Sequence, residues 1–184
     1  QPAGGKLSAT ASVFRLVQQN LLTADPANPT FQRQTGEVRI NGVELEGKAH
    51  LVDSLDLTLA ATWLDPVVTR NNDGLEGKRL AGAPRVQLSS WMNYRPAYGL
   101  ELGLGLRHMG ATLNDSNTLR TPAYTLVDAA VHLDLVRMDP AWTGSRLSLT
   151  ANNLTDKVYV NNCAWGKCYY GASRTVMLAY SQTW

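Results

Sequence analysis

The sequence predicts an all-β protein, an antiparallel meander of about eight strands. Apolar residues recur at every second position in one segment after another, as in the leucines that alternate with Glu101, Gly103 and Gly105. Such alternation is typical of a strand with one apolar and one polar face. The connections between these segments are alternately long and short, and helical spacing of apolar residues is nowhere sustained. A meander is therefore expected, with its long connections at one end.

The first four predicted strands alternate apolar residues with polar or charged ones. They are residues 6–18 (Leu7 to Val13 against Ser8 to Ser12), 36–51 (Val43 to Leu51 against Glu44 to His50), 55–63 (Leu55 to Trp63 against Asp56 to Thr62) and 85–94 (Val86 to Tyr94 against Arg85 to Asn93). Trp91 falls on the polar side of the fourth strand.

The last four predicted strands continue the pattern. They are residues 100–107 (four leucines against Glu101 and Arg107), 127–135 (Val127 to Leu135 against Asp128, His132 and Asp134), 146–151 (Leu147 to Ala151 against Arg146 to Thr150) and 174–184 (Val176 to Tyr180 on one face). The alternation breaks at Asn152–Asn153, which predicts a bulge or a departure from the apolar surface. Glycines at 103 and 105 predict a place where another group packs close to the backbone.

Composition excludes some classes of protein. The 184 residues suffice for one domain. No run of 18 apolar residues occurs, so a transmembrane helix is not expected, although barrel strands escape this criterion because half their residues are polar. A net charge of +2 gives no reason to expect a nucleic-acid partner. The chain begins at Gln1 without a recognisable signal peptide, which favours a processed chain or a piece of a longer one.

The two cysteines, Cys163 and Cys168, have four residues between them. This is not the spacing of a redox or zinc CxxC pair, and no second cysteine pair or nearby histidine completes a metal site. A disulfide is the favoured interpretation, and it indicates an oxidising compartment or the cell surface.

The connection lengths and the aromatic residues favour a barrel in the outer membrane. Long connections are expected at residues 20–35, 65–84, 108–121 and 159–173, and shorter ones at 52–54, 96–99 and 136–145. Outer-membrane barrels have long extracellular loops, short periplasmic turns and aromatic girdles at both rims. Aromatic residues fall near the short-turn end (Tyr94, Tyr98, Trp142, Trp184) and near the long-loop end (Trp63, Tyr124, Tyr159). Trp184 is expected at the periplasmic rim.

Several segments resemble TonB-dependent siderophore receptors of the ferrichrome and hydroxamate type. They are residues 20–26, 35–46 and 124–129, then Asn152 to Tyr159, the Cys163–Cys168 pair, and Tyr169 to Arg174 with the terminal strand. The resemblance implies that residues 1–184 are the C-terminal part of a transmembrane β-barrel of 22 strands with a plugged lumen. It also implies uptake of a ferric siderophore, energised through TonB, with neither the plug domain nor the TonB-contacting segment in this chain.

The resemblance further implies where a ligand binds. In the family, the last extracellular loop, closed by two cysteines, carries an aromatic residue that helps to cap the ferric siderophore. The candidates here are Trp165, Tyr169 and Tyr170, although Ala164 stands where the family aromatic often lies. Cations of the second long loop (Arg70, Lys78 and Arg79) are further candidates for attracting an anionic chelate, or for facing lipopolysaccharide.

No pattern predicts an enzyme, a cofactor or a bound metal. His50, His108 and His132 lie on separate predicted strands without metal-ligand spacing, and Glu44 and Glu46 are expected to be solvated or ion-paired on a polar face. The expected partners are a ferric siderophore, outer-membrane lipid and TonB.

Two alternatives remain open from the sequence. One is a free-standing eight-stranded outer-membrane barrel with a structural or adhesive role, in which the many charges of the polar face crowd a narrow lumen. The other is a soluble eight-stranded calyx that holds a small apolar ligand, which requires the leucine faces to point inward.

Overall fold

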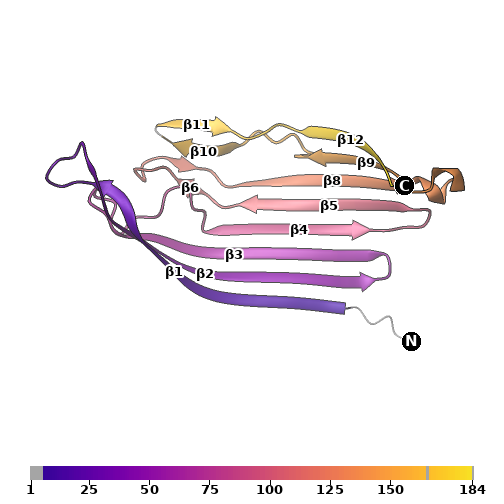
Figure 1. The fold of residues 1–184 in the computed structure, drawn as a ribbon, viewed down its shortest axis with the longest axis horizontal. Helices are drawn as coiled ribbons and strands as arrows, with labels where there is room; N and C mark the ends of the chain where they lie inside the picture. Colours follow the sequence, from indigo (N-terminus) through magenta and orange to yellow (C-terminus); the bar gives the residue numbers. More distant parts are fainter. Residues whose placement is uncertain (1–5, 165, 184) are drawn as a thin grey trace.

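The computed structural model describes residues 6–164 and 166–183, and within them eight strands form one antiparallel sheet (Figure 1). In their order across the sheet, the strands are β1 (Lys6–Ala24), β2 (Gln32–Val52), β3 (Leu55–Arg70), β4 (Val86–Tyr94), β5 (Leu100–Met109), β8 (Tyr124–Asp134), β9 (Ser145–Asn152) and β12 (Thr175–Gln182). Each strand pairs with the next in an up-and-down meander, which confirms the predicted fold class.

The connections lie at the expected ends of the sheet. Short ones follow β2, β4 and β8, the last containing two 3-10 helices, η1 (Leu135–Arg137) and η2 (Pro140–Trp142). The connections at the opposite end carry two small ribbons. β6 (Thr112–Leu113) pairs with β7 (Arg120–Thr121), and β10 (Val160–Ala164) pairs with β11 (Lys167–Tyr170). In Figure 1 these ribbons lie at the left, and η1 and η2 lie at the right.

The first three strands are longer than the sequence predicts. β1 continues to Ala24 past a register shift at Asn20, whose φ of 63° is left-handed. β2 begins at Gln32 and β3 extends to Arg70. Beyond the apolar band neither face needs to be apolar, so the ladder continues where alternation has ended. Alternation therefore marks the apolar band rather than the full length of the strand.

The register aligns the apolar positions of all eight strands on one face. Leu102, Val131, Leu149 and Leu178 are consecutive ladder partners across four strands. Their exposed fractions are 37%, 38%, 43% and 67%, so they do not face a dry interior. Among the described residues only five hydrophobic ones are buried, Val38, Val68, Leu126, Ala130 and Cys163. The inward-facing leucines that a soluble calyx requires are thus not observed.

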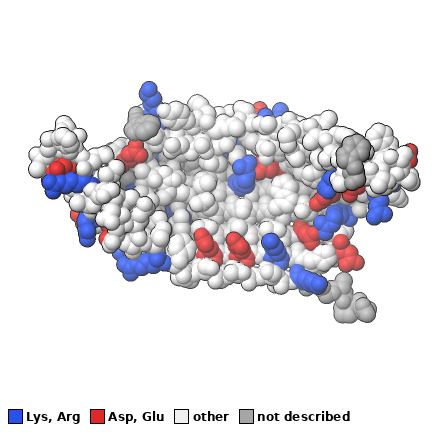
Figure 2. Space-filling model, viewed as in Figure 1, with Lys and Arg blue, Asp and Glu red and all other residues white. Residues whose placement is uncertain are grey.

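The opposite face is polar. Thr10, Glu46 and Ala60 are ladder partners on it, and Asp128 lies there with 6% exposure. Figure 2 shows a row of acidic and basic side chains along one edge of the sheet, an acidic and a basic group together near its centre, and further charged groups at its two ends. No helix in residues 6–164 and 166–183 is long and apolar enough to cross a membrane.

Gly103 and Gly105 leave room for the ring of Trp91. A Cβ atom built on either glycine would lie 2.4 Å from that ring, and Trp91 Nε1 donates a hydrogen bond to Asn93 Oδ1 at 2.7 Å. The predicted close approach at these glycines is therefore observed. The group that packs there is a side chain of the neighbouring strand β4.

A side chain at position 105 is expected to be destabilising. Gly105→Val places methyl groups where the Trp91 ring lies, and overpacking of this kind costs about 1 to 3 kcal/mol. Gly47→Val is the matched control, because the nearest atom to its added Cβ would lie 3.9 Å away. Urea unfolding of the two variants in lipid vesicles measures the difference. Equal midpoints would show that Trp91 does not need the space over Gly105.

Candidate functional site

The polar face carries a hollow of about 630 Å³ near the long-connection end. Its wall includes Trp91 from β4, Arg107 from β5 and Asp128 from β8. Its lining also includes Asn153 and Tyr159 from the connection between β9 and β12, as well as Thr58 of β3 and Thr175 of β12. The hollow is thus a site where the polar face of the sheet meets the segment that contains the two cysteines.

An ion pair occupies the floor of this hollow. Arg107 donates to both carboxylate oxygens of Asp128, with 2.8 Å from Nη2 to Oδ1. The side chain of Asp128 is 8% exposed and that of Arg107 is 53% exposed. Asp128 Oδ1 also accepts the backbone N–H of Asn153 at 2.9 Å. The carboxylate therefore joins β5, β8 and the turn that follows β9.

The alternation break at Asn152–Asn153 is a strand end rather than a bulge. β9 ends at Asn152, and Asn153 has a φ of 52° and is 2% exposed. The break thus corresponds to the point at which the chain leaves the sheet. The alternation of apolar residues marks this break, but it carries no signal for the polar contacts that converge on Asn153.

Tyr124 and Tyr159 form an aromatic pair above the ion pair. Their ring centroids lie 4.3 Å apart at an interplanar angle of 40°. The Tyr124 hydroxyl donates to Asn161 Oδ1 at 3.2 Å. The expected place of both tyrosines in an outward-facing girdle is wrong: the β5–β8 register places Thr125 on the apolar face, so Tyr124, which packs against Tyr159, lies on the polar face. Trp63, which pairs with Val43 and Val86, does lie on the apolar face.

The predicted disulfide is present between Cys163 and Cys168 and joins β10 to β11. We call residues 159–172, which contain it, the disulfide hairpin. Tyr169 and Tyr170 lie on β11 with exposed fractions of 51% and 76%, and neither lines the hollow. Trp165 lies outside the residues that the structure describes.

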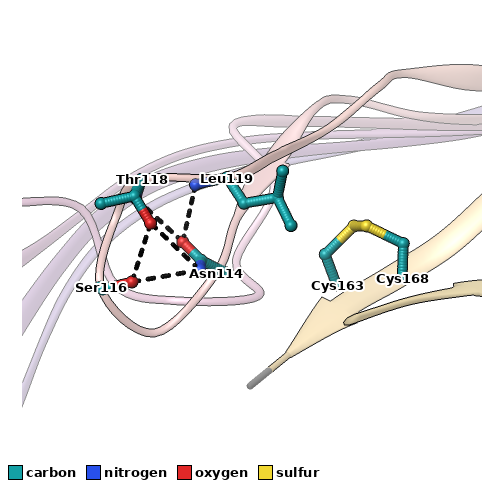
Figure 3. Close-up of a disulfide and its surroundings, with 6 residues drawn as sticks. All are labelled: Asn114, Ser116, Thr118, Leu119, Cys163 and Cys168. Carbon is teal, nitrogen blue, oxygen red and sulfur yellow. Dashed lines mark hydrogen bonds between the residues drawn. A yellow bond between two sulfur atoms is a disulfide. The ribbon is translucent and has the colours of Figure 1, made fainter. Parts of the chain in front are cut away.

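The disulfide hairpin packs against β7, the strand that follows the loop from β6. Strand β10 contacts β7, and Cys163 is 2% exposed. Figure 3 shows the disulfide beside the loop that Asn114 organises. Asn114 Oδ1 accepts the backbone N–H groups of Thr118 and Leu119, both at 2.9 Å. An ordered loop therefore supports one side of the hairpin.

The cations of the second long loop do not form one cluster. Arg79 is half-buried and donates from Nη2 to the carbonyls of Ala83 and Ala111, at 3.3 and 3.4 Å. Burial, and then the nearby guanidinium groups of Arg85 and Arg120, lower the pKa of Arg79. Arg70 lies 4.0 Å from Glu37, and Lys78 is exposed. Arg79 thus joins two loops, which its position in the sequence did not indicate.

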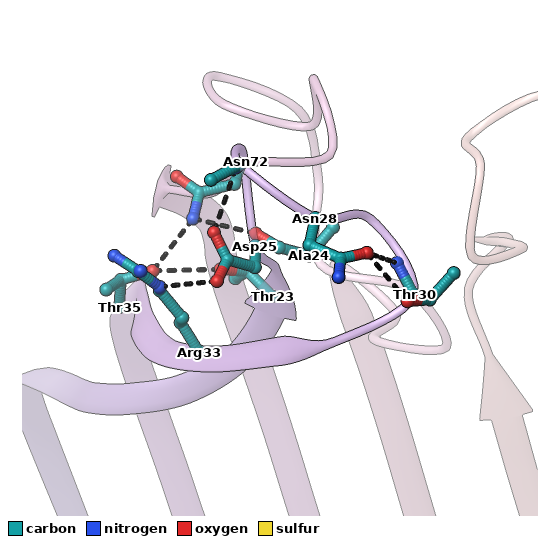
Figure 4. A network of polar contacts seen from close by, with 9 residues as sticks. Thr23, Ala24, Asp25, Asn28, Thr30, Arg33, Thr35 and Asn72 are labelled. Atoms are coloured by element: carbon teal, nitrogen blue, oxygen red, sulfur yellow. Dashed lines mark hydrogen bonds and ion pairs between the residues drawn. The ribbon is translucent and has the colours of Figure 1, made fainter.

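A second polar network joins the first two long connections (Figure 4). Asn72 Nδ2 donates to Ala24 O at 2.9 Å and to Thr35 Oγ1 at 3.0 Å. Asp25 accepts from the backbone N–H of Ala27 and from Arg33 Nε, and these bonds lower the pKa of its carboxyl group. The second long connection is thus hydrogen-bonded to the first through Asn72 and to the third through Arg79, so these three connections are held together.

Each histidine has a local partner. His50 bonds to Asp56 at 2.6 Å, His108 to Thr125 at 2.9 Å and His132 to Ser148 at 2.8 Å. In the described part of the chain, no group of three histidine, cysteine, aspartate or glutamate side chains is arranged to hold a metal ion.

A continuous apolar face, a hollowed polar face and loops gathered at one end define a segment of a membrane β-barrel. The chain belongs to the family described as "TonB dependent receptor-like, beta-barrel", which matches residues 2–154. Proteins of this family are outer-membrane β-barrels.

Relatives of known name cover almost the whole chain. The ferrioxamine B receptor of Salmonella typhimurium is 39% identical over 96% of this chain and 26% of the relative. The ferrichrome outer membrane transporter/phage receptor of Escherichia coli is 36% identical over 96% of this chain and 24% of the relative. The chain thus spans about a quarter of the length of these curated relatives.

Solved structures share the fold. The siderophore receptor PiuA from Acinetobacter baumannii matches with a TM-score of 0.78 and 24% identity over 95% of this chain and 26% of that chain. The ferric citrate transporter FecA matches with a TM-score of 0.77 and 19% identity over 95% of this chain and 28% of that chain. These similarities show that the eight-stranded sheet shares its fold with about a quarter of each of these chains.

Proposed function

We propose that the chain is part of an outer-membrane receptor that binds a ferric siderophore and passes it inward, with energy supplied through TonB and without covalent chemistry. The observation that carries this proposal is the identity of 36 to 39% to receptors named for ferrichrome and ferrioxamine B, over 96% of the chain. A hydroxamate chelate of iron is the substrate class that these names support.

The two edge strands of the sheet support the proposal that these eight strands are part of a larger barrel. β1 and β12 are the two edges of the described sheet and are not hydrogen-bonded to each other. Unpaired backbone groups in lipid cost several kcal/mol each, so an edge in the membrane requires a partner. We propose that residues 1–184 form the C-terminal segment of the barrel and that further strands of the receptor pair with both edges. The plug and the TonB-contacting segment then belong to another part of the receptor.

The two ends of the sheet differ, and this difference supports one orientation in the membrane. We propose that the connections carrying the disulfide hairpin and the Asn72 network are extracellular, and that β12 ends at the periplasmic rim. Two polar networks and a disulfide at one end suit a surface exposed to an oxidising exterior. Arg70 and Lys78 then lie where lipopolysaccharide or an anionic chelate is within reach.

The disulfide hairpin is the proposed ligand contact, through Trp165, Tyr169 and Tyr170. The two tyrosines are exposed on β11 at the long-connection end, so they are accessible to a ligand that arrives from outside. Aromatic rings supply a large contact area at low conformational entropy, which suits a neutral chelate with apolar surface.

Trp165→Ala in the full-length receptor is expected to weaken binding of ferrichrome or ferrioxamine B about tenfold, a loss typical of one aromatic contact. Intrinsic fluorescence quenching measures the affinity. Trp142→Ala is the matched control, because Trp142 lies in η2 at the opposite end of the sheet with 49% exposure. Unchanged affinity in Trp165→Ala would remove this residue from the site.

The proposed transport function is tested by uptake of radioactive iron in cells that carry the full-length receptor as their only ferric siderophore receptor. Uptake of iron supplied as ferrichrome or ferrioxamine B, abolished when TonB is deleted, is the expected result. A receptor that supports uptake of neither chelate is incompatible with the proposed substrate class.

A further inference from the structure

We propose that Asn153 is the positioning residue of the disulfide hairpin, and that Asp128 holds it in place for ligand capture. This inference rests on the proposed function, because it assigns the hairpin a ligand to capture. It concerns a residue that does not itself touch the ligand and acts through the hairpin it holds.

The side chain of Asn153 bonds to the chain just before the hairpin and to the last residue of the hairpin. Its Nδ2 group donates to Lys157 O at 2.9 Å and to Ala172 O at 3.2 Å. Its Oδ1 atom accepts the backbone N–H of Lys157 at 2.9 Å. One amide group therefore fixes the chain as it enters the hairpin and as it leaves, although Lys157 and Ala172 are 15 residues apart.

The backbone at Asn153 is itself held by β8. Its backbone N–H donates to Asp128 Oδ1 at 2.9 Å, and the same carboxylate is held by Arg107. The next amide, Leu154 N–H, donates to Val127 O at 2.7 Å. With 2% exposure and a left-handed φ of 52°, Asn153 occupies a backbone position that favours asparagine or glycine. The hairpin is thereby connected to the rigid wall of β5 and β8.

A second contact acts at the same base. The ring of Tyr159 lies directly over Gly171, where a Cβ atom would come within 2.0 Å of it, and packs against Tyr124 of β8. Gly171 N–H also donates to Tyr159 O at 2.9 Å. The two strands of the hairpin thus leave the wall in one orientation, which determines where Tyr169 and Tyr170 lie.

Fixing the hairpin before binding removes an ordering step from ligand capture. A hairpin released from its clamp occupies the binding-competent position for only a fraction of the time, and the apparent affinity falls by that fraction. The association rate falls with it, while the dissociation rate of the formed complex is unchanged. Loss of a direct contact has the opposite signature, because it acts mainly on dissociation.

Asn153→Gly in the full-length receptor tests the inference, since glycine keeps the left-handed backbone and the bond to Asp128 but removes all three side-chain bonds. Asn20→Gly is the matched control. Asn20 is also left-handed, with a φ of 63°, and in the described residues its side chain makes no hydrogen bond. Hydrogen–deuterium exchange follows residues 157–172, and stopped-flow fluorescence with ferrichrome and ferrioxamine B gives the two rate constants.

We expect Asn153→Gly to raise exchange in residues 157–172 about tenfold, without change in β8 and β9, and to slow association by a similar factor. Asn20→Gly is expected to change neither. Exchange in residues 157–172 equal to that of the unmodified receptor would overturn the inference, as would raised exchange with unchanged association. If the unmodified receptor binds neither chelate, the proposed function fails, and the exchange result still decides whether Asn153 holds the hairpin.

Discussion

Leu59→Arg is expected to destabilise the folded barrel in lipid by about 2 to 4 kcal/mol, the range for arginine on a lipid-facing position near the bilayer midplane. Leu59 is 48% exposed on the apolar face. Its ladder partners Gly47 and Ser90 lie between the level of Tyr94 and that of Trp63, the aromatic residues nearest the two ends of this face. Leu59 is therefore expected near the middle of the hydrocarbon layer.

The neighbouring residue supplies the control. Thr58 precedes Leu59 in the same strand, is also exposed and pairs with Lys48 and Trp91 on the polar face. Thr58→Arg adds the same side chain at the same depth but directs it to the polar face, where little destabilisation is expected. Reversible urea unfolding in lipid vesicles measures both variants. If the two are destabilised equally, the assignment of the apolar face to lipid is wrong.

The fold was largely predictable because a sheet with one lipid-facing side requires alternation across its whole apolar band. A one-residue slip of any strand would move its leucines to the polar face, so the pattern determines both the strands and their register. The rung from Leu102 to Leu178 follows directly from this constraint. The extension of β1 to Ala24 was not predictable, because beyond the apolar band strand pairing does not require apolar and polar residues to alternate.

The candidate site was less predictable because its contacts are three-dimensional and polar. The spacing of Cys163 and Cys168 favoured their bond, which is present. The alternation placed Arg107 and Asp128 on one face, yet it did not show that they are paired or that Asn153 donates to the same carboxylate. Two signals were available and were not combined: opposite charges on the polar face of adjacent strands, and a left-handed-prone Asn–Asn pair where the alternation stops.

Asp128→Ala is expected to have the largest effect on the polar face, destabilising the barrel by about 2 to 3 kcal/mol. Hydrogen bonds to a charged group contribute about 1.5 to 3 kcal/mol, and this carboxylate accepts from Arg107 and from Asn153 N–H. The effect remains below that of a fully buried ion pair, because the Arg107 side chain is 53% exposed and regains water when the carboxylate is lost. The Asn153 N–H does not regain a hydrogen bond to water, because Asn153 is only 2% exposed.

Two further variants separate these contributions. Asp128→Asn keeps an oxygen that can accept from Asn153 but removes the negative charge that pairs with Arg107. We therefore expect Asp128→Asn to be about half as destabilising as Asp128→Ala. Asp134→Ala is the matched control on the same strand, because Asp134 lies 3.7 Å from Arg146 and is 50% exposed, a geometry that contributes about 1 kcal/mol or less. Urea unfolding in lipid vesicles ranks the three variants. If Asp128→Ala is no more destabilising than Asp134→Ala, the carboxylate of Asp128 is not what joins β5, β8 and the turn at Asn153.

Hydrogen exchange gives a second expected result. Asp128→Ala leaves the Asn153 N–H without an acceptor, so we expect this variant to raise hydrogen exchange in the disulfide hairpin as well as to lower the free energy of unfolding. Asp134→Ala is expected to leave exchange in the hairpin unchanged.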